Sequence, residues 1–365
     1  GLFTADISAP ASPAIVGRWY KYGGPSSIAV TGNLACVGNR DAGLAVVDIT
    51  NPTAPSLATS YQTPDWALET ATYGTYVYLA ANDRVLGFDI SDPAHLRAVF
   101  GRIAYYPQAV AISGHYLFVA CPYDGILVFD ITNPESPSLK ATLRTLGSPE
   151  DIAVSGNYAV VADGPNGALI VDITNPELPI PLGRYQPEAD NYTRSVEIKG
   201  NLVFVAEYGG VTILDITNPS TPTKVGRCLG YAGYLQVSGN LLFDGESGGM
   251  QVFDISNPAS PLKVCDLGIS AYGFSVTGNR VMIASPDMGL RIMDFTDYYC
   301  GDVDGSRTAA DISDLSFLVD FLFASGPAPA DMQAANLDGA GSVDVGDLTS
   351  LVDFLFLGQP TLQCN

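Results

Sequence analysis

Two acid-rich loops near the end of the chain have residue types that suit a calcium ion. Calcium takes about six to eight oxygen ligands, which a short loop supplies at alternating positions with a carboxylate closing the site. The second loop, at 335–347, has candidate oxygen ligands at positions 1, 3, 7, 9 and 12: Asn336, Asp338, Ser342 (through its carbonyl), Asp344 and Asp347. Position 5 is Ala340, whose side chain has no ligand atom, so water would have to replace it. We therefore expect calcium as a cofactor.

The first loop, at 301–314, has a similar set of oxygen-bearing residues with less regular spacing. Its candidate ligands are Asp302, Asp304, Ser306, Thr308, Asp311 and Asp314. One residue is inserted after Ser306, which moves the later acids one place along the loop. The second loop is therefore the better candidate of the two.

An apolar segment overlaps the end of each loop and continues past it, and we expect both segments to form helices. The segments are DISDLSFLVDFLF at 311–323 and DVGDLTSLVDFLF at 344–356. A module of about 65 residues cannot hide apolar side chains all round two helices. Part of this apolar surface should therefore pack on the preceding domain or on another chain. The connection at 297–300 is too short and bulky for a flexible tether.

The chain has six cysteines and no C-x-x-C pair, so a zinc or thioredoxin-type site has no support. Cys300 and Cys364 bracket the C-terminal module, and we expect a disulfide between them in an oxidising compartment. The other four cysteines fall in expected strands, where buried free thiols are the expectation: Cys36, Cys121, Cys228 and Cys265.

The remaining chain is built from a repeat of about 40 residues. Its most regular phrases are GLAVVDITNP at 43–52, GILVFDITNP at 125–134, GALIVDITNP at 167–176, GVTILDITNP at 210–219 and GMQVFDISNP at 249–258. The anchoring aspartates are Asp6, Asp48, Asp89, Asp130, Asp172, Asp215, Asp254 and Asp294. Between anchors, each unit has an alternating segment and two short apolar segments, which indicates four strands per unit.

Four strands per unit predict the blade of a β-propeller. One apolar strand of each unit ends in a glycine where a two-residue hairpin needs positive φ: Gly32, Gly74, Gly114, Gly156, Gly200, Gly239 and Gly278. These turns predict a mainly β, seven-bladed β-propeller with the Gly-turn strand innermost. Residues 11–20 would supply the outer strand of the last blade. Residues 1–8 are then left over: they compete for one slot, extend an edge, or add a strand to a neighbouring molecule.

The repeats resemble the LVIVD-repeat family over about residues 1–297, and the segment 300–364 resembles a type I dockerin. The first resemblance implies a bacterial or archaeal extracellular propeller. The second implies an EF-hand-like helical module with calcium-dependent folding and attachment to a protein such as a cohesin. We therefore expect two domains, a propeller at 1–297 and a dockerin-like module at 298–365.

Composition narrows the class of partner. The formal net charge is −21, which repels nucleic acid and anionic lipid. No run of 18 or more apolar residues occurs, so no membrane span is expected. The chain begins at Gly1 without a leader, so we interpret it as a mature chain or an excised fragment, secreted or on the cell surface.

Residues that could catalyse a reaction are few. The two histidines, His95 and His115, fall in expected loops, and no nucleophile or nucleotide-binding phrase is present. The turn after each third expected strand carries an acid, which reflects either turn chemistry or an acidic ring for a cation or sugar: Asp41, Asp83, Asp124, Asp163, Glu207, Glu246 and Asp287. We expect no enzymatic activity.

Aromatic residues in the loops that lead to the expected innermost strands form a candidate ligand rim: Tyr22, Trp66, Tyr105, Tyr106, Tyr192, Tyr231, Tyr234 and Tyr272. Such a rim suits protein or carbohydrate recognition. The first functional hypothesis is a structural or interaction protein that binds partners or copies of itself, in the limit as a filament. The alternative is a dockerin-bearing protein that binds or acts on carbohydrate at the propeller mouth.

Overall fold

The computed structural model describes residues 2–5, 18–19, 24–63, 66–187, 191–277, 280–285, 289–294, 312–323, 343, 348–352 and 355. Two compact units are present, a ring of sheets and a C-terminal helical unit. The expected boundary between the domains at residues 297 and 298 stays a prediction.

The ring contains six four-stranded antiparallel sheets, each made of consecutive strands, and one five-stranded sheet. The first two sheets contain β3 (Pro25–Thr31), β4 (Leu34–Asn39), β5 (Gly43–Asp48) and β6 (Ser56–Tyr61), and then β7 (Ala67–Tyr73), β8 (Tyr76–Ala81), β9 (Arg84–Asp89) and β10 (Arg97–Ile103). The third and fourth contain β11 (Ala109–Ser113), β12 (Tyr116–Cys121), β13 (Gly125–Asp130) and β14 (Ser138–Leu143), and then β15 (Asp151–Ser155), β16 (Tyr158–Ala162), β17 (Ala168–Asp172) and β18 (Ile180–Tyr185). The fifth and sixth contain β19 (Ser195–Lys199), β20 (Leu202–Glu207), β21 (Gly210–Asp215) and β22 (Thr223–Cys228), and then β23 (Tyr234–Ser238), β24 (Leu241–Glu246), β25 (Gly249–Asp254) and β26 (Leu262–Leu267).

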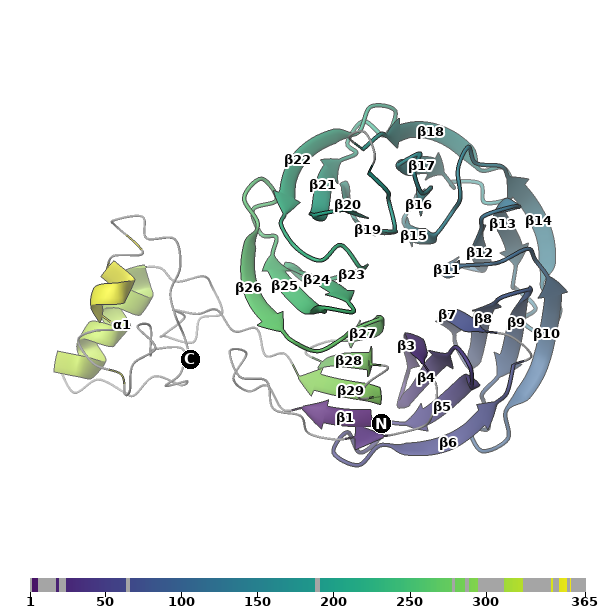
Figure 1. Cartoon of the computed structure of the whole chain (residues 1–365), viewed down its shortest axis with the longest axis horizontal. Coiled ribbons are helices and arrows are strands. Elements are labelled where there is room, and N and C mark those ends of the chain that lie inside the picture. The colour runs from purple at the N-terminus through teal and green to yellow at the C-terminus, as the bar shows by residue number, and fades with distance from the viewer. Residues whose placement is uncertain are drawn as a thin grey trace. The chain divides into compact units, whose positions relative to one another are not determined.

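The Gly-turn strand is innermost in each of these sheets, as the sequence predicted, and the last strand of each lies at the outside of the ring (Figure 1). Neighbouring innermost strands contact one another around the whole circle, and β27 (Gly273–Thr277) contacts β3. This arrangement is a β-propeller.

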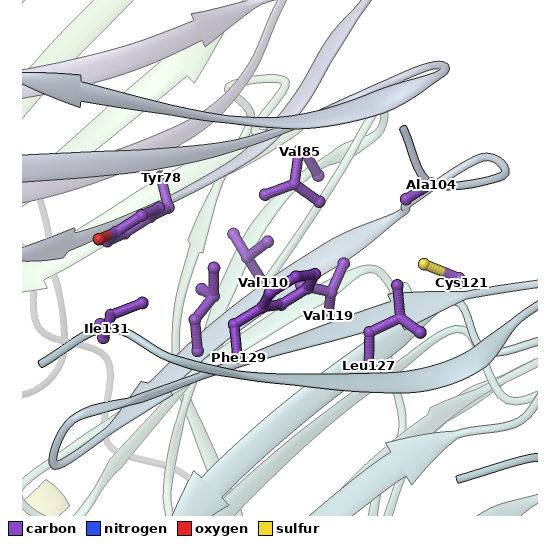
Figure 2. Packing of buried hydrophobic residues seen from close by; sticks show 11 residues of the cluster. Tyr78, Val85, Ala104, Val110, Val119, Cys121, Leu127, Phe129 and Ile131 are labelled. Carbon is purple, nitrogen blue, oxygen red and sulfur yellow. The ribbon is translucent and has the colours of Figure 1, made fainter. Parts of the chain in front are cut away.

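The middle strands of each blade are buried on both faces, which explains their continuous apolar runs. On β12, Leu117, Val119 and Cys121 pack toward the preceding blade, whereas Phe118 and Ala120 pack toward the following one. Figure 2 shows the first of these layers, where Tyr78 and Val85 lie opposite side chains of β12 and β13. Each blade thus packs on both neighbouring blades through apolar side chains.

The recurring D-I-T-N-P phrase forms the turn between the third and fourth strands. In the third blade, Asp130 Oδ1 accepts a hydrogen bond from the Thr132 N–H at 2.8 Å, and Asn133 Oδ1 accepts one from the Glu135 N–H at 3.2 Å. Ile131 between them is fully buried. The Thr132 hydrogen bonds lower the pKa of Asp130, with a smaller contribution from Lys140. The strongest motif of the sequence is therefore structural.

The hairpin glycines adopt the conformation that the sequence predicted. Gly74 and Gly114 have φ of 58° and 57°, and Gly32, Gly156, Gly200 and Gly239 are similar. Gly278 lies outside the described residues.

The five-stranded sheet combines both ends of the repeat region in the order β1 (Leu2–Ala5), β2 (Arg18–Trp19), β29 (Gly289–Asp294), β28 (Arg280–Ser285) and β27. Trp19 pairs with Leu290, so part of the segment 11–20 supplies an outer strand to the last sheet as expected. The structure shows six four-stranded blades of the seven blades that the sequence predicted. The remaining sheet has a fifth strand because β1 extends its edge, pairing with β2 and also with β29.

A close backbone approach joins this composite sheet to the first blade. A Cβ placed on Gly273 would lie 2.3 Å from the Ser26 carbonyl oxygen. Only glycine permits this distance between β27 and β3 without a shift of one strand. Contact between the last and first innermost strands therefore depends on Gly273.

The C-terminal unit contains α1 (Ile312–Phe323), and residues 348–352 and 355 are also helical. Leu318 and Leu351 form a buried cluster with Leu315, Leu322 and Leu348 packed around it. Val319 and Phe323 on α1 remain exposed, so one helix is apolar on more than its packed side. Among the described residues, no helix combines the length and apolarity that a membrane span requires.

We expect Ile131→Ala to lower the free energy of unfolding by about 3 kcal/mol, because it removes a fully buried side chain from the layer in Figure 2. Ile131→Val should cost only about 1 kcal/mol, because most of the volume is kept. Urea titration followed by tryptophan fluorescence measures both. Equal losses for the two variants would show that the motif isoleucine is not a core residue.

Candidate functional site

A cavity of about 500 Å³ occupies one end of the central channel. Its walls come from the innermost strands, and mostly from their first residues, such as Ser26 and Ser27 of β3 and Ser195 to Glu197 of β19. Loop residues that precede these strands, including Gln108 and Glu150, complete the wall. The cavity therefore lies at the end of the channel where the innermost strands begin.

We call this end of the ring the loop face. It carries the turns between the second and third strands and the connections from each outermost strand to the next innermost strand. Hydrogen bonds join these two sets of loops, for example from Ala67 N to the Arg40 carbonyl at 3.3 Å and from Tyr105 N to Asp124 Oδ2 at 3.3 Å. The loop face is therefore one connected surface around the channel mouth.

Three carboxyl groups from different blades line the cavity: Glu69 on β7, Asp151 on β15 and Glu197 on β19. Two of them accept hydrogen bonds from the next innermost strand. Glu69 Oε2 accepts from Val110 N at 3.0 Å, and Asp151 Oδ2 accepts from Val196 N at 3.0 Å.

The same bridge is made by uncharged side chains at two further junctions. Ser195 Oγ accepts from Leu235 N at 3.3 Å, and Gln236 Oε1 accepts from Val276 N at 2.8 Å. An innermost strand has a sheet neighbour on one side only, so some of its N–H groups have no ladder partner. These side chains satisfy such groups across the gap between blades.

Burial changes the acidity of all three carboxyl groups. Desolvation raises the pKa of Glu197 to about 7 and raises the pKa of Asp151, and it raises the pKa of Glu69 well above its usual range. Repulsion from Asp151 adds to the shifts of Glu69 and Glu197, whereas hydrogen bonds to backbone N–H groups oppose them. The side chains border an open channel, yet protein atoms surround them closely.

Two arginines lie at the same cavity. Arg194 pairs with Glu246 at 3.1 Å. The Arg40 guanidinium lies over the rings of Trp66 and Tyr272, at 5.9 and 5.6 Å from their centroids. The cavity lining thus carries four acids (Glu69, Glu150, Asp151, Glu197) and two arginines, a formal excess of two negative charges when all are ionised.

The described members of the expected aromatic rim all lie on the loop face. Trp66, Tyr105, Tyr106 and Tyr234 are exposed, whereas Tyr192, Tyr231 and Tyr272 are half-buried. Tyr22 lies outside the described residues. The Tyr192 hydroxyl donates to Glu150 Oε1 at 2.6 Å, so this tyrosine supports the cavity wall.

Sequence reasoning missed two groups of residues at this site. Tyr123 and Tyr208 are exposed in the turns between second and third strands, next to the turn acids Asp124 and Glu207. The channel carboxyls were also missed. Their signal is a polar residue within an otherwise apolar or small-residue strand, as in ALETATY for Glu69 and SVEIK for Glu197.

Four of the described turn acids are bound to arginines, so the described members do not form an open acidic ring. Asp163 is fully buried and pairs with Arg184 at 2.8 Å. Glu207 is buried with Arg227 at 3.4 Å. Similar pairs join Asp83 to Arg84 and Glu246 to Arg194. Asp124 accepts the Tyr105 N–H, and Asp287 lies outside the described residues. Turn chemistry explains these acids better than a cation site.

The expected calcium ligands are not described by the structure, except that the backbone of Asp314 lies in α1. Asp302, Asp304, Ser306, Thr308, Asp311, Asn336, Asp338, Ser342, Asp344 and Asp347 lie outside the described residues, as do Cys300 and Cys364. In the part of the chain that is described, no three His, Cys, Asp or Glu side chains are grouped closely enough to hold a metal ion. Calcium binding stays a prediction.

The other cysteines and the histidines carry no reactive arrangement. Cys36, Cys121 and Cys228 are buried free thiols, as expected, and burial raises the pKa of Cys36 to about 12; Cys265 is half-buried. His95 contacts Asp92 at 2.8 Å, and His115 contacts the Tyr73 hydroxyl at 2.7 Å. His95 lies between β9 and β10 and His115 between β11 and β12, and neither lines the cavity.

The ring of sheets and its central cavity define a β-propeller. The LVIVD repeat matches residues 1–20, 23–63, 67–101, 106–145, 146–186, 190–229 and 229–265. Since these matches cover most of the chain, the protein belongs to the LVIVD repeat family.

Solved structures agree on the fold alone, because their sequence identities are low. A protein from Lactobacillus plantarum aligns with a TM-score of 0.65 and 12% identity over 78% of this chain and 92% of its own. A crystal structure of the computationally designed Ika8 protein aligns with a TM-score of 0.59 and 13% identity over 77% of this chain and 99% of its own. No curated protein matches the chain.

We expect the free energy of unfolding to fall between pH 5 and pH 8, because the folded protein holds the Glu197 proton up to about pH 7 and the unfolded chain releases it near its usual value. Stability from this group is full at low pH and is lost as pH rises. Raised pKa values of Glu69 and Asp151 act in the same direction.

Glu197→Gln should reduce this pH dependence, and Glu135→Gln, an exposed control, should leave it unchanged. Thermal melts across this pH range give the comparison. An undiminished pH dependence in Glu197→Gln would contradict the assignment of the shift to this carboxyl.

Proposed function

We propose that this protein is a non-enzymatic interaction platform outside the cell, and that its loop face binds a protein partner. One observation carries the proposal. Aromatic side chains are exposed around the channel mouth, while the carboxyl groups beneath them are hydrogen-bonded to the backbone that joins the blades. Exposed aromatic side chains above carboxyl groups that already bind backbone N–H groups suit recognition of a partner better than catalysis.

We define the aromatic patch as Tyr105, Tyr106 and Tyr123, which lie together on the loop face. Tyr106 and Tyr123 pack with ring centroids 5.8 Å apart, and both remain largely exposed. Tyr106 has a φ of 54°, an uncommon conformation for a bulky residue. Such strain at an exposed tyrosine supports a binding role, because local strain gathers at ligand-binding positions.

The other features of this proposal extend the resemblance seen in the sequence. The five-stranded sheet acts as a seventh blade that closes the ring. The C-terminal unit binds calcium and attaches the platform to a protein, either a cohesin-like partner or another copy of the chain, as in a filament. β1 lies in the chain's own sheet, so its donation to a neighbour is not proposed.

The test selects binders from a displayed random-peptide library against the full chain. Their affinities are then compared for Tyr106→Ser/Tyr123→Ser and for Leu178→Ser/Ile180→Ser, a control pair exposed on a different surface. We expect the first variant to weaken binding about tenfold or more, because aromatic anchors dominate interface energies, and the control to leave it unchanged. An equal loss of peptide affinity in the two double variants would contradict the proposal that the loop face binds a protein partner.

Carbohydrate recognition at the same mouth is the alternative, since exposed Trp66 and Tyr105 also suit sugar stacking. A glycan array run on the same variants separates the two. Glycan binding that is lost in Tyr106→Ser/Tyr123→Ser, with no selected peptides, would replace the protein-binding proposal by this one.

A further inference from the structure

The cavity under the loop face has the size and depth to receive a side chain from a bound segment. Its volume of about 500 Å³ falls within the range of small-ligand pockets, about 300–1,000 Å³. Tyr234 at the start of β23 and Glu69 on β7 both line it, so its wall reaches from the exposed mouth down to the partly buried carboxyls.

The carboxyl groups in the cavity have no cationic partner. Among the described residues, no Lys, Arg or His forms an ion pair with Glu69, Asp151 or Glu197. Glu69 uses one oxygen for the Val110 N–H and receives no hydrogen bond from a described residue at the other. Two fully buried acids of this propeller do have such partners, Asp163 with Arg184 and Glu207 with Arg227. The carboxyl groups that line the cavity can therefore accept further hydrogen bonds from a ligand.

The placement of these carboxyls on three different innermost strands favours an organic cation with several donors over a metal ion. No three acidic groups among the described residues lie close enough to share a metal ion. A guanidinium group has five N–H donors in one plane and can reach several separated acceptors. It is also less strongly hydrated than an ammonium group, which lowers the cost of moving it into the channel.

Arg40 supplies a second, independent feature at the mouth. Its guanidinium is held over Trp66 and Tyr272, and it makes no hydrogen bond or ion pair with any described residue through its side chain. A charged donor fixed by two rings at a cavity rim suits a carbonyl oxygen of an incoming main chain. An acceptor-rich channel below a donor at the rim matches a peptide segment that presents an arginine.

We propose that a protein segment binds across the mouth with an arginine side chain in the channel among Glu69, Asp151 and Glu197, and with a main-chain carbonyl on Arg40. This inference rests on the proposed function and names the chemistry of the partner. The exposed Trp66 beside Arg40 covers the segment from the rim.

Binding of the guanidinium is coupled to release of protons, because it favours the ionised carboxyls. The charged or titratable groups around the ligand are Glu69, Glu150, Asp151, Glu197, Arg40, Arg194 and Tyr234. Because burial raises the pKa values of Glu69, Asp151 and Glu197, affinity should rise with pH over the range in which these carboxyls ionise.

The experiment uses the full chain and three probes, followed by titration calorimetry at pH 6 and pH 8. Acetyl-arginine-N-methylamide has both the guanidinium and flanking carbonyls, agmatine has the guanidinium alone, and acetyl-citrulline-N-methylamide is the uncharged isostere. We expect both guanidinium probes to bind more tightly at pH 8 and the citrulline probe to show no binding. The variants are Glu69→Gln, Glu197→Gln and Arg40→Gln, with Glu135→Gln as the surface control.

Glu69→Gln and Glu197→Gln should each weaken the two guanidinium probes about tenfold, the loss expected for one charge-assisted hydrogen bond. Glu69→Gln keeps a side-chain carbonyl for the Val110 N–H, and Glu197→Gln keeps one for the Ile198 N–H. Arg40→Gln should weaken the arginine derivative but not agmatine, which has no carbonyl.

Several outcomes would overturn the inference. They are equal binding of the citrulline and arginine probes, no binding of either guanidinium probe at pH 8, or full affinity in the Glu69→Gln and Glu197→Gln variants. Binding of agmatine alone would point to a free small guanidine and would contradict the peptide source. Selected peptides that need Tyr106 and Tyr123 but contain no arginine would leave the platform standing and refute this inference alone.

Discussion

The hydrogen bond from a side chain on one innermost strand to the backbone N–H of the next is the interaction on which the propeller depends. Blades are separate sheets, so no backbone ladder joins them, and the innermost strands meet where the ring is narrowest. Glu69, Asp151, Ser195 and Gln236 bridge four of these junctions. At another junction, Gly273 removes a side chain so that β27 and β3 can approach. Apolar layers between the blades then complete the packing.

This constraint also explains why polar groups gather in the channel. The bridging position is near the start of each innermost strand, so the side chains that satisfy backbone donors line the cavity at the loop face. Carboxyls serve as acceptors there, and burial raises their pKa values. Some of the groups that hold the blades together are thereby also acceptors for the organic cation proposed above. Structure and proposed recognition thus share one set of residues.

Much of the fold could be predicted from the sequence, because the repeat determines the local structure directly. In the turn of the third blade, the side chains of Asp130 and Asn133 accept backbone hydrogen bonds and Ile131 is buried, as their residue types favour. Glycines such as Gly74 lie where the hairpin requires positive φ. The position of the fifth strand could not be predicted from the sequence. The repeat pattern of Leu2–Ala5 fits a strand inside the last blade as well as an extra strand at its edge. The channel acids were missed because Glu69 and Glu197 are far apart in sequence and resemble ordinary strand polar residues.

Amide hydrogen exchange at the innermost strands tests the central claim most directly. The amides to follow are those of Val110, Val196, Leu235 and Val276, which donate to side chains of the preceding blade rather than to their own sheet. The account predicts slow exchange at all four, and loss of protection at Val110 alone in Glu69→Ala. Fast exchange at these amides in the unaltered protein, or protection of Val110 that survives Glu69→Ala, would contradict it.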